Sequence, residues 1–289
     1  MQMELGFWYV RLCAFLSSRL PLRLCYTLAV VVADVVYALC PRLREDTKSS
    51  IAHVLGQTKT SRDVSRVTRK CLRNYAKSVM ELFRYSRRPA ELGDRVILEG
   101  LDRLDAALSE GKGVIIAGLH LGSWDVGGTF LAQRYYPLNA IVRSSFNSDK
   151  LSRFMQDMRR EVGIAVISAQ GGIRHAAQVL RRNELLALLV DAPNKGKLAK
   201  VRFLQGYAQF STGVATLAIR TKAAVLPGYI VRLPDNTFKG SIGEKIEFQF
   251  SGDFRRDIQH FTQSLVNSLQ GFVKQYPEQW GMLRKIWCE

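Results

Sequence analysis

A histidine and a carboxylate stand close together in the segment His120-Leu-Gly-Ser-Trp-Asp125, directly after the apolar run at residues 113–118. A histidine can take a proton from a hydroxyl near neutral pH when a carboxylate fixes its tautomer and stabilises the imidazolium. Since the apolar run reads as a buried strand, both side chains are expected at a strand end, where ligands bind in open parallel sheets. The segment therefore predicts acid/base chemistry on an alcohol, with His120 as the base and Asp125 holding its ring.

Other polar residues follow apolar runs in the same way. Arg143 comes after NAIV and Asp191 after LLALLV, so we expect both at the same sheet edge as His120, as substrate-binding residues. Arg143 would clamp a phosphate or pair with Asp191, and a solvated charge is the alternative. A basic stretch beyond Asp191 is predicted to be a loop that meets phosphates or an acidic protein surface, or else a solvated loop. Its basic residues are Lys195, Lys197, Lys200 and Arg202.

Several other chemistries are not supported. No phosphate-binding glycine motif is present, and residues 122–126 do not form the G-x-S-x-G motif that would make Ser123 a hydrolase nucleophile. The five cysteines lack the spacing of a disulfide framework or a zinc site, which favours a reducing compartment and no bound metal. The remaining histidines are expected to be structural: His53, His175 and His260.

The elements that must position these residues alternate along the chain after Pro89. Strands are predicted at 95–99, 113–117, 138–142, 164–167, 185–190, 223–232 and 239–250. Helices are predicted at 60–88, 101–109, 125–134, 150–162, 172–182, 211–221 and 253–276, with Ser211 as an N-cap and Glu81 as a candidate buried partner. This alternation predicts an α/β fold with a mainly parallel sheet flanked by helices, in one catalytic domain at 46–289.

The N-terminal segment, residues 1–45, is expected to associate with a membrane. Residues 24–40 are apolar except for Thr27 and Asp34, and arginines flank them on both sides. The run is marginal for a full span, so the helix would lie in one leaflet or cross, and a buried core helix is the alternative. The net charge of +17 should attract anionic lipid, phosphorylated substrates, acidic carrier proteins or nucleic acid. A nucleic-acid partner is not expected, because no recognition motif is present.

In these features the sequence resembles the late acyltransferases of lipid A biosynthesis and the related phosphatidylinositol mannoside acyltransferases. The resemblance runs along nearly the whole chain: an apolar N-terminal helix, the H-x4-[DE] motif at His120 and Asp125, and polar strand ends at Arg143 and Asp191. It also includes the stretch STGVATLAIRTKAAVLPGYI at 211–230 and the motif PEQW at 277–280.

The resemblance implies a glycerolipid acyltransferase-like fold and acyl transfer from acyl carrier protein or acyl-CoA, without another cofactor, to a hydroxyl of a membrane glycolipid. The reaction would take place on the cytoplasmic face of the inner membrane, with no acyl-enzyme. The acceptor would be a lipid A precursor or related glycolipid, or alternatively a phosphatidylinositol mannoside or another phospholipid. Departures at Asp125, at residues 192–193 and at 281–285 weaken the case for lipid A. A basic membrane-surface scaffold without catalytic activity, or a basic nucleic-acid-binding protein, is the alternative outside the enzyme class.

Overall fold

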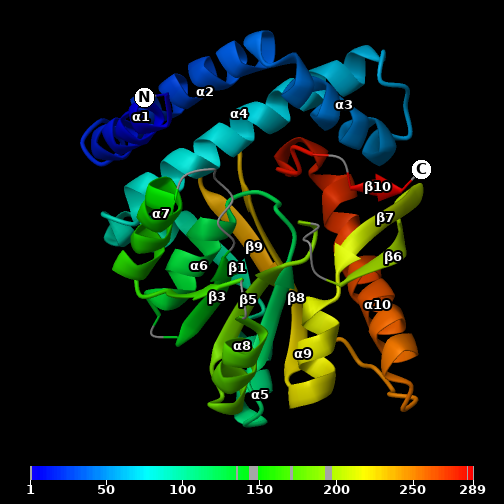
Figure 1. Ribbon diagram of the computed structural model, residues 1–289. Coiled ribbons are helices and arrows are strands. Elements are labelled where there is room, and N and C mark those ends of the chain that lie inside the picture. Colours follow the sequence, from blue (N-terminus) through cyan, green and yellow to red (C-terminus); the bar gives the residue numbers. More distant parts are fainter. Residues whose placement is uncertain are drawn as a thin grey trace.

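The computed structural model describes residues 2–134, 136–142, 149–169, 172–192, 197–284 and 286–288 (Figure 1). At its centre is a sheet of seven strands in the order β1-β9-β8-β2-β5-β3-β4. The strands are β1 (Val96–Glu99), β2 (Val114–Gly118), β3 (Leu138–Val142), β4 (Ala165–Ser168), β5 (Leu185–Leu189), β8 (Ala224–Arg232) and β9 (Phe238–Ile242). Five neighbours from β8 to β4 run parallel, whereas β9 and β1 run the other way. The predicted fold class is confirmed.

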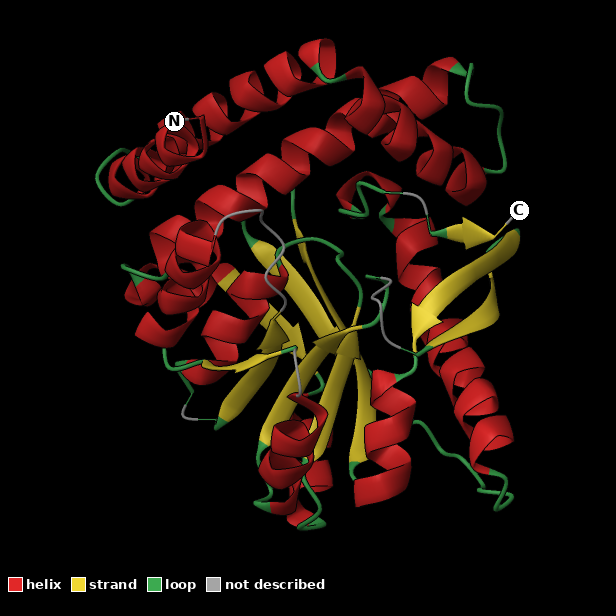
Figure 2. Cartoon of the chain, viewed as in Figure 1, coloured by secondary structure: helices red, strands yellow, loops and turns green. Residues whose placement is uncertain are grey.

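Helices cover both faces of this sheet, as Figure 2 shows. One face packs against α5 (Leu101–Ser109) and α6 (Trp124–Ala132), with α7 (Asp149–Glu161) beside β4. The other face packs against α8 (Gly172–Arg181), α9 (Gly213–Thr221) and α10 (Phe254–Gln275). Side chains of a strand alternate between faces, so Val114 joins the first core and Ile115 the second. Burial on both faces explains why these strands read as continuous apolar runs.

The long helix α4 (Arg62–Tyr85) crosses the carboxyl ends of the parallel strands (Figure 1). Its Ser78 hydroxyl donates to the carbonyl of Gly122, just beyond β2, at 3.0 Å. On its outer side lie α1 (Gln2–Ser17) and α2 (Leu22–Leu39), and α3 (Pro41–Leu55) packs near its start. The predicted helix at 60–88 is confirmed, and the domain boundary expected at residue 45 falls within α3.

Only one face of α2 is buried. Tyr26, Ala29 and Ala33 pack inward, and the Asp34 carboxylate accepts hydrogen bonds from Arg69 and Arg73 of α4. The opposite face exposes six large apolar residues: Leu24, Leu28, Val31, Val32, Val35 and Leu39. Within the described residues, α2 is the one helix long and apolar enough to cross a membrane. It is therefore not the core helix that was the alternative for this segment.

A second, smaller sheet lies where the basic stretch was predicted to be a loop. It joins β6 (Leu198–Phe203) to β7 (Gly206–Ser211) and β10 (Trp287–Cys288). Ala199, Val201 and Phe203 point into the core, an alternation that the two basic residues between them obscured. Short 3-10 helices complete the elements: η1 (Pro89–Arg95) and η2 (Pro277–Gln279).

Some predicted boundaries were wrong. Ser211 ends β7 and Thr212 precedes α9, so Ser211 is not the N-cap, although its hydroxyl accepts from the Gly213 amide. The strand predicted to reach residue 250 stops at Ile242. The Gly243 amide still donates to the Pro227 carbonyl in the same register, but Pro227 has no amide hydrogen to complete the pair.

Candidate active site

His120 and Asp191 form a hydrogen-bonded pair at the carboxyl ends of β2 and β5. The His120 Nδ1 lies 2.7 Å from Asp191 Oδ1, and the His120 backbone amide donates to both carboxylate oxygens at 3.1 and 3.0 Å. The Asp191 side chain is fully buried, whereas that of His120 is 26% exposed. With Nδ1 occupied by the carboxylate, Nε2 is the ring nitrogen free to take a proton from a substrate.

Asp125 has a different partner from the one predicted. Its carboxylate forms a bidentate ion pair with Arg159, with Nε to Oδ1 at 2.7 Å and Nη2 to Oδ2 at 2.9 Å. Asp125 lies in the first turn of α6, and this position turns its side chain toward the last turn of α7 instead of the His120 ring. The carboxylate bonded to the His120 ring is therefore that of Asp191, which was predicted as a substrate-binding residue.

Arg159 is a residue that sequence reasoning missed. In the run DMRRE it reads like its neighbour Arg160, which makes an ordinary surface pair with Asp157. The Arg159 side chain is only 14% exposed, and a third contact joins its Nη1 to the Met155 carbonyl at 3.1 Å. No motif marks this arginine, because its burial depends on how α7 packs beside α6.

The loop that carries His120 is held by the C-terminal PEQW segment and by β8. The Gly281 amide donates to the His120 carbonyl at 2.6 Å, and the Gly122 amide donates to the Gln279 carbonyl at 2.9 Å. Gly122 has a φ of +65°, and a Cβ there would collide with the Ile230 carbonyl oxygen, so the turn requires glycine. The backbone of residues 120–122 is thus fixed from two sides.

Trp280 completes the surroundings of Asp191. This fully buried indole donates from Nε1 to Asp191 Oδ2 at 2.9 Å, on the oxygen that His120 Nδ1 does not use. The buried carboxylate therefore has donors at both oxygens, which compensates for its removal from water. The C-terminal segment therefore both holds the backbone of the His120 loop and donates a hydrogen bond to Asp191.

A large cavity of about 920 Å³ opens at His120. Trp124, Asp125 and Arg159 line it beside the histidine, and the ring of Trp124 meets the His120 ring edge to face at 5.0 Å. Much of its wall is apolar, including Leu98, Ile116, Leu131, Leu138, Ile164 and Ile242. Six glycines also line the cavity: Gly118, Gly127, Gly128, Gly213, Gly228 and Gly281.

The lining also includes polar groups. Burial, followed by the Asp125 carboxylate, raises the pKa of Tyr75 above its ordinary value, so this phenol stays neutral and can donate. Three basic side chains line the cavity together with Arg159: Lys197, Arg220 and Arg284. The site can therefore hold a long apolar chain while its polar groups face a hydroxyl, a carbonyl or a phosphate.

The remaining predicted site residues separate into three groups. Lys197 is exposed and lines the cavity, as stated. Lys200 and Arg202 project from the outer side of β6, where Lys200 lies over the Tyr207 ring, and neither lines the cavity. Arg143 and Lys195 lie outside the described residues. Over the described ranges, no group of three His, Cys, Asp or Glu side chains is arranged to hold a metal ion.

Comparison with known proteins identifies the family of this chain. The model of the family described as bacterial lipid A biosynthesis acyltransferase matches residues 1–289. Phosphatidylinositol mannoside acyltransferases from two strains of Mycobacterium tuberculosis are 30% identical over 224 residues, which cover 75% of this chain and 68% of theirs. The protein of the same name from Mycolicibacterium smegmatis is 27% identical over 252 residues, covering 84% and 79%. Because the match spans the whole chain, this protein belongs to the bacterial lipid A biosynthesis acyltransferase family and is an acyltransferase.

Proposed function

We propose that this protein transfers a fatty acyl group from a carrier-protein or CoA thioester to a hydroxyl of a membrane glycolipid, with His120 as the general base. The observation that carries the proposal is the His120–Asp191 pair at an apolar cavity large enough for a lipid chain. The basic scaffold without catalytic activity is set aside, because the family is one of acyltransferases.

In the proposed reaction the acceptor oxygen attacks the thioester carbonyl while His120 Nε2 takes its proton. The C–O bond forms, the tetrahedral intermediate collapses with cleavage of the C–S bond, and the leaving thiolate receives the proton from His120. Asp191 stabilises the transient imidazolium and keeps the proton of the neutral ring on Nδ1. No covalent acyl-enzyme is required, in agreement with the lack of a nucleophile motif at Ser123.

Asp125 acts in this proposal through Arg159. Two of the five guanidinium N–H groups bond Asp125 and one bonds Met155, so two are left among the contacts of the described residues. They lie at the cavity wall and could donate to the phosphate or carbonyl of a bound substrate. Lys197, Arg220 and Arg284 add positive charge to the same cavity, as an anionic donor or acceptor requires.

Two acceptors are compatible with the comparisons. The family description favours a lipid A precursor or a related glycolipid, whereas the similar mycobacterial proteins are named for phosphatidylinositol mannoside. Lys200 and Arg202, exposed on β6, would serve in either case as contacts for an acidic carrier protein or for the CoA phosphates.

We propose further that the protein works at the cytoplasmic face of the cytoplasmic membrane. The exposed apolar face of α2 continues onto α1, where Trp8, Leu12 and Phe15 are also exposed. Exposed arginines border this surface and suit anionic lipid headgroups: Arg11, Arg19, Arg23 and Arg42. The five cysteines are free, in keeping with a reducing compartment.

The test measures radiolabelled acyl transfer from acyl carrier protein and from CoA into separate extracts that contain lipid A precursors or phosphatidylinositol mannosides. We expect His120→Ala to lower the rate at least about 100-fold, since general base catalysis is worth that much. The exposed His175 supplies the matched control, and His175→Ala should retain full activity. Equal activity of wild type and His120→Ala would refute the assigned base, and the mass of the labelled lipid identifies the acceptor.

A further inference from the structure

The buried ion pair between Glu81 of α4 and Arg232 of β8 lies away from the His120–Asp191 pair and has no role in the reaction described above. The Glu81 side chain is fully buried and that of Arg232 is 3% exposed. The guanidinium donates from Nε to Glu81 Oε1 and from Nη2 to Oε2 at 2.7 Å. Such a pair is costly to bury unless further hydrogen bonds satisfy it.

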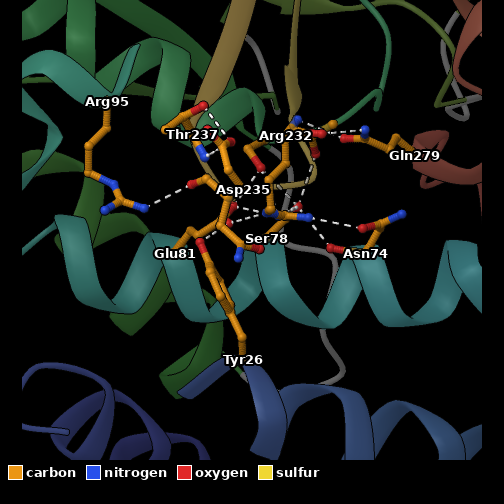
Figure 3. Close-up of polar contacts among 12 residues, drawn as sticks. Tyr26, Asn74, Ser78, Glu81, Arg95, Arg232, Asp235, Thr237 and Gln279 are labelled. Atoms are coloured by element: carbon orange, nitrogen blue, oxygen red, sulfur yellow. Dashed lines mark hydrogen bonds and ion pairs between the residues drawn. The ribbon is translucent and has the colours of Figure 1, made fainter. Parts of the chain in front are cut away.

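Those further bonds come from four separate parts of the chain, and Figure 3 labels residues of three of them around the pair. Tyr26 of α2 donates its hydroxyl to Glu81 Oε1 at 2.6 Å, from a position that is 5% exposed. Asn74 of α4 accepts from Arg232 Nη1 at 3.0 Å and donates to the Glu278 carbonyl at 2.8 Å. The Gln279 amide bonds the Arg232 backbone in both directions, each at 2.8 Å.

The fourth part is the loop between His120 and Asp125. Ser123 donates its hydroxyl to Glu81 Oε2 at 2.5 Å and accepts from Arg232 Nη2 at 2.9 Å. Its carbonyl accepts the amides of Val126 and Gly127, the first intrahelical bonds of α6. The start of the helix that carries Asp125 is therefore tied to the same carboxylate as Tyr26.

We infer that Tyr26, Glu81 and Ser123 form a positioning link, through which the seating of the lipid-facing helix α2 on α4 orders the loop that carries His120 and Asp125. The inference rests on the proposed transfer reaction and adds that transfer depends on α2 beyond its contact with lipid. When α2 leaves α4, Glu81 Oε1 loses its tyrosine donor in a dry environment, so the carboxylate must move or admit water. Either change disturbs the hydrogen bond from the Ser123 hydroxyl to Glu81, and this loosens the first turn of α6.

The test is Tyr26→Phe in the full chain, because this change keeps the ring packing of α2 and removes only the hydroxyl. Hydrogen exchange of the peptide 119–130 is measured first, as it needs no substrate. We expect its protected amides to exchange about tenfold faster, the effect of losing a hydrogen bond to a buried charge. The matched control is Tyr136→Phe, which removes another tyrosine-to-carboxylate bond of 2.6 Å, the one to Asp105, and should leave this peptide unchanged.

Kinetics supply a second readout that a purely anchoring residue would not move. In detergent micelles, where membrane affinity no longer limits the reaction, Tyr26→Phe should lower kcat about tenfold with an unchanged KM for the acyl donor. Unchanged exchange at 119–130 would overturn the link, and so would unchanged kcat in micelles. If no His120-dependent transfer is found at all, the proposed function fails, while the exchange result still decides the link.

Ser123→Ala provides an independent variant in case Tyr26→Phe does not fold. It removes the loop's own bond to Glu81, so it should by itself speed exchange at 119–130. In the double variant Tyr26→Phe/Ser123→Ala, adding Tyr26→Phe should raise the exchange rate of peptide 119–130 less than it does in the wild-type protein. The reason is that Ser123→Ala has already removed the bond between the loop and Glu81. Additive effects, as expected for Tyr136→Phe with Ser123→Ala, would overturn the inference.

Discussion

Asp191 and Asp125 are both carboxylates near His120, yet their surroundings assign them different work. Asp191 is fully buried and bonds the imidazole, while Asp125 is bound by a guanidinium that neutralises it. A neutralised carboxylate stabilises an imidazolium poorly, because its field is largely cancelled at short range. The difference should therefore appear in the kinetics of the two amide variants.

We expect Asp191→Asn to lower kcat about 10³- to 10⁴-fold, as loss of the ring partner does in histidine-based catalysis. Asp125→Asn should instead raise KM and lower kcat no more than about tenfold, because it frees Arg159 without touching the ring. Steady-state kinetics on both variants, with thermal unfolding to confirm folding, make the comparison. A larger kcat loss in Asp125→Asn would return the ring-holding role to Asp125.

Trp280→Phe should lower the stability of the fold. Without the indole donor, Asp191 Oδ2 keeps only the bond from the His120 amide, while the carboxylate stays fully buried. The free energy of unfolding should fall by about 1 to 3 kcal/mol beyond the loss of ring packing, as measured by chemical denaturation.

Trp287 offers the matched control for this variant. Its buried Nε1 has no hydrogen-bond partner among the described residues, so Trp287→Phe removes an indole without removing a bond. The loss of stability in Trp287→Phe should therefore be the smaller of the two. Equal losses in Trp280→Phe and Trp287→Phe would contradict the role of Trp280.

Residue identity and strand position were enough to place His120 and Asp191 together, because both follow buried parallel strands. They were not enough to decide whether Asp125 or Asp191 bonds the His120 ring, since this depends on the direction in which α6 leaves the loop. Arg159 could not be found for the same reason. Its pairing needs α7 to lie beside α6, which no local pattern contains.

At the scale of elements, the alternation of strands and helices after Pro89 predicted the central sheet well, because two buried faces leave a strong apolar signal. The helices α1 and α3 and the β6–β7 hairpin were missed. These elements are short or half exposed, and they are stabilised by neighbours distant in sequence, such as β10 beside β7. The long helix α4 was predicted, although its central place across the strand ends was not.

The attachment of α2 to α4 should weaken in acid. Hydrogen bonds from Arg73 and Arg69 hold the pKa of Asp34 below its ordinary value. A group with a lowered pKa in the folded state stabilises it above the unfolded pKa of about 3.9 and loses this contribution as pH falls further. We therefore expect Asp34→Asn to lower Tm at pH 7, with the difference from wild type shrinking below about pH 4.

Asp157→Asn is the control for that measurement, since Asp157 makes an exposed pair with Arg160 on α7. Exposed pairs contribute little, so its Tm should match that of wild type at both pH values. A Tm difference for Asp34→Asn that persists unchanged at low pH would mean that the charge pair is not what holds α2.

At the scale of the whole molecule, the question is how α2 meets the membrane. Tyr26 and Asp34 stand eight residues apart on α2, and both bond to α4 across the inner face. A helix that crossed the bilayer in this pose would carry α4 with its many charges into the hydrocarbon, at high cost. A helix lying in the interface keeps both bonds and submerges only its outer face.

Val31→Asp tests this arrangement, because Val31 is 53% exposed on the outer face of α2. The change should weaken binding to anionic vesicles at least about tenfold, through lost apolar burial and added negative charge. Turnover of micellar substrate should stay at the wild-type level, since Tyr26 and Asp34 still seat α2. Ile97→Asp makes the same charge change on β1, at a residue 60% exposed, and should leave vesicle binding intact. If both variants bind vesicles as wild type does, the face formed by α1 and α2 is not the membrane contact; if Val31→Asp also loses micellar turnover, α2 serves catalysis through its outer face and not through Tyr26.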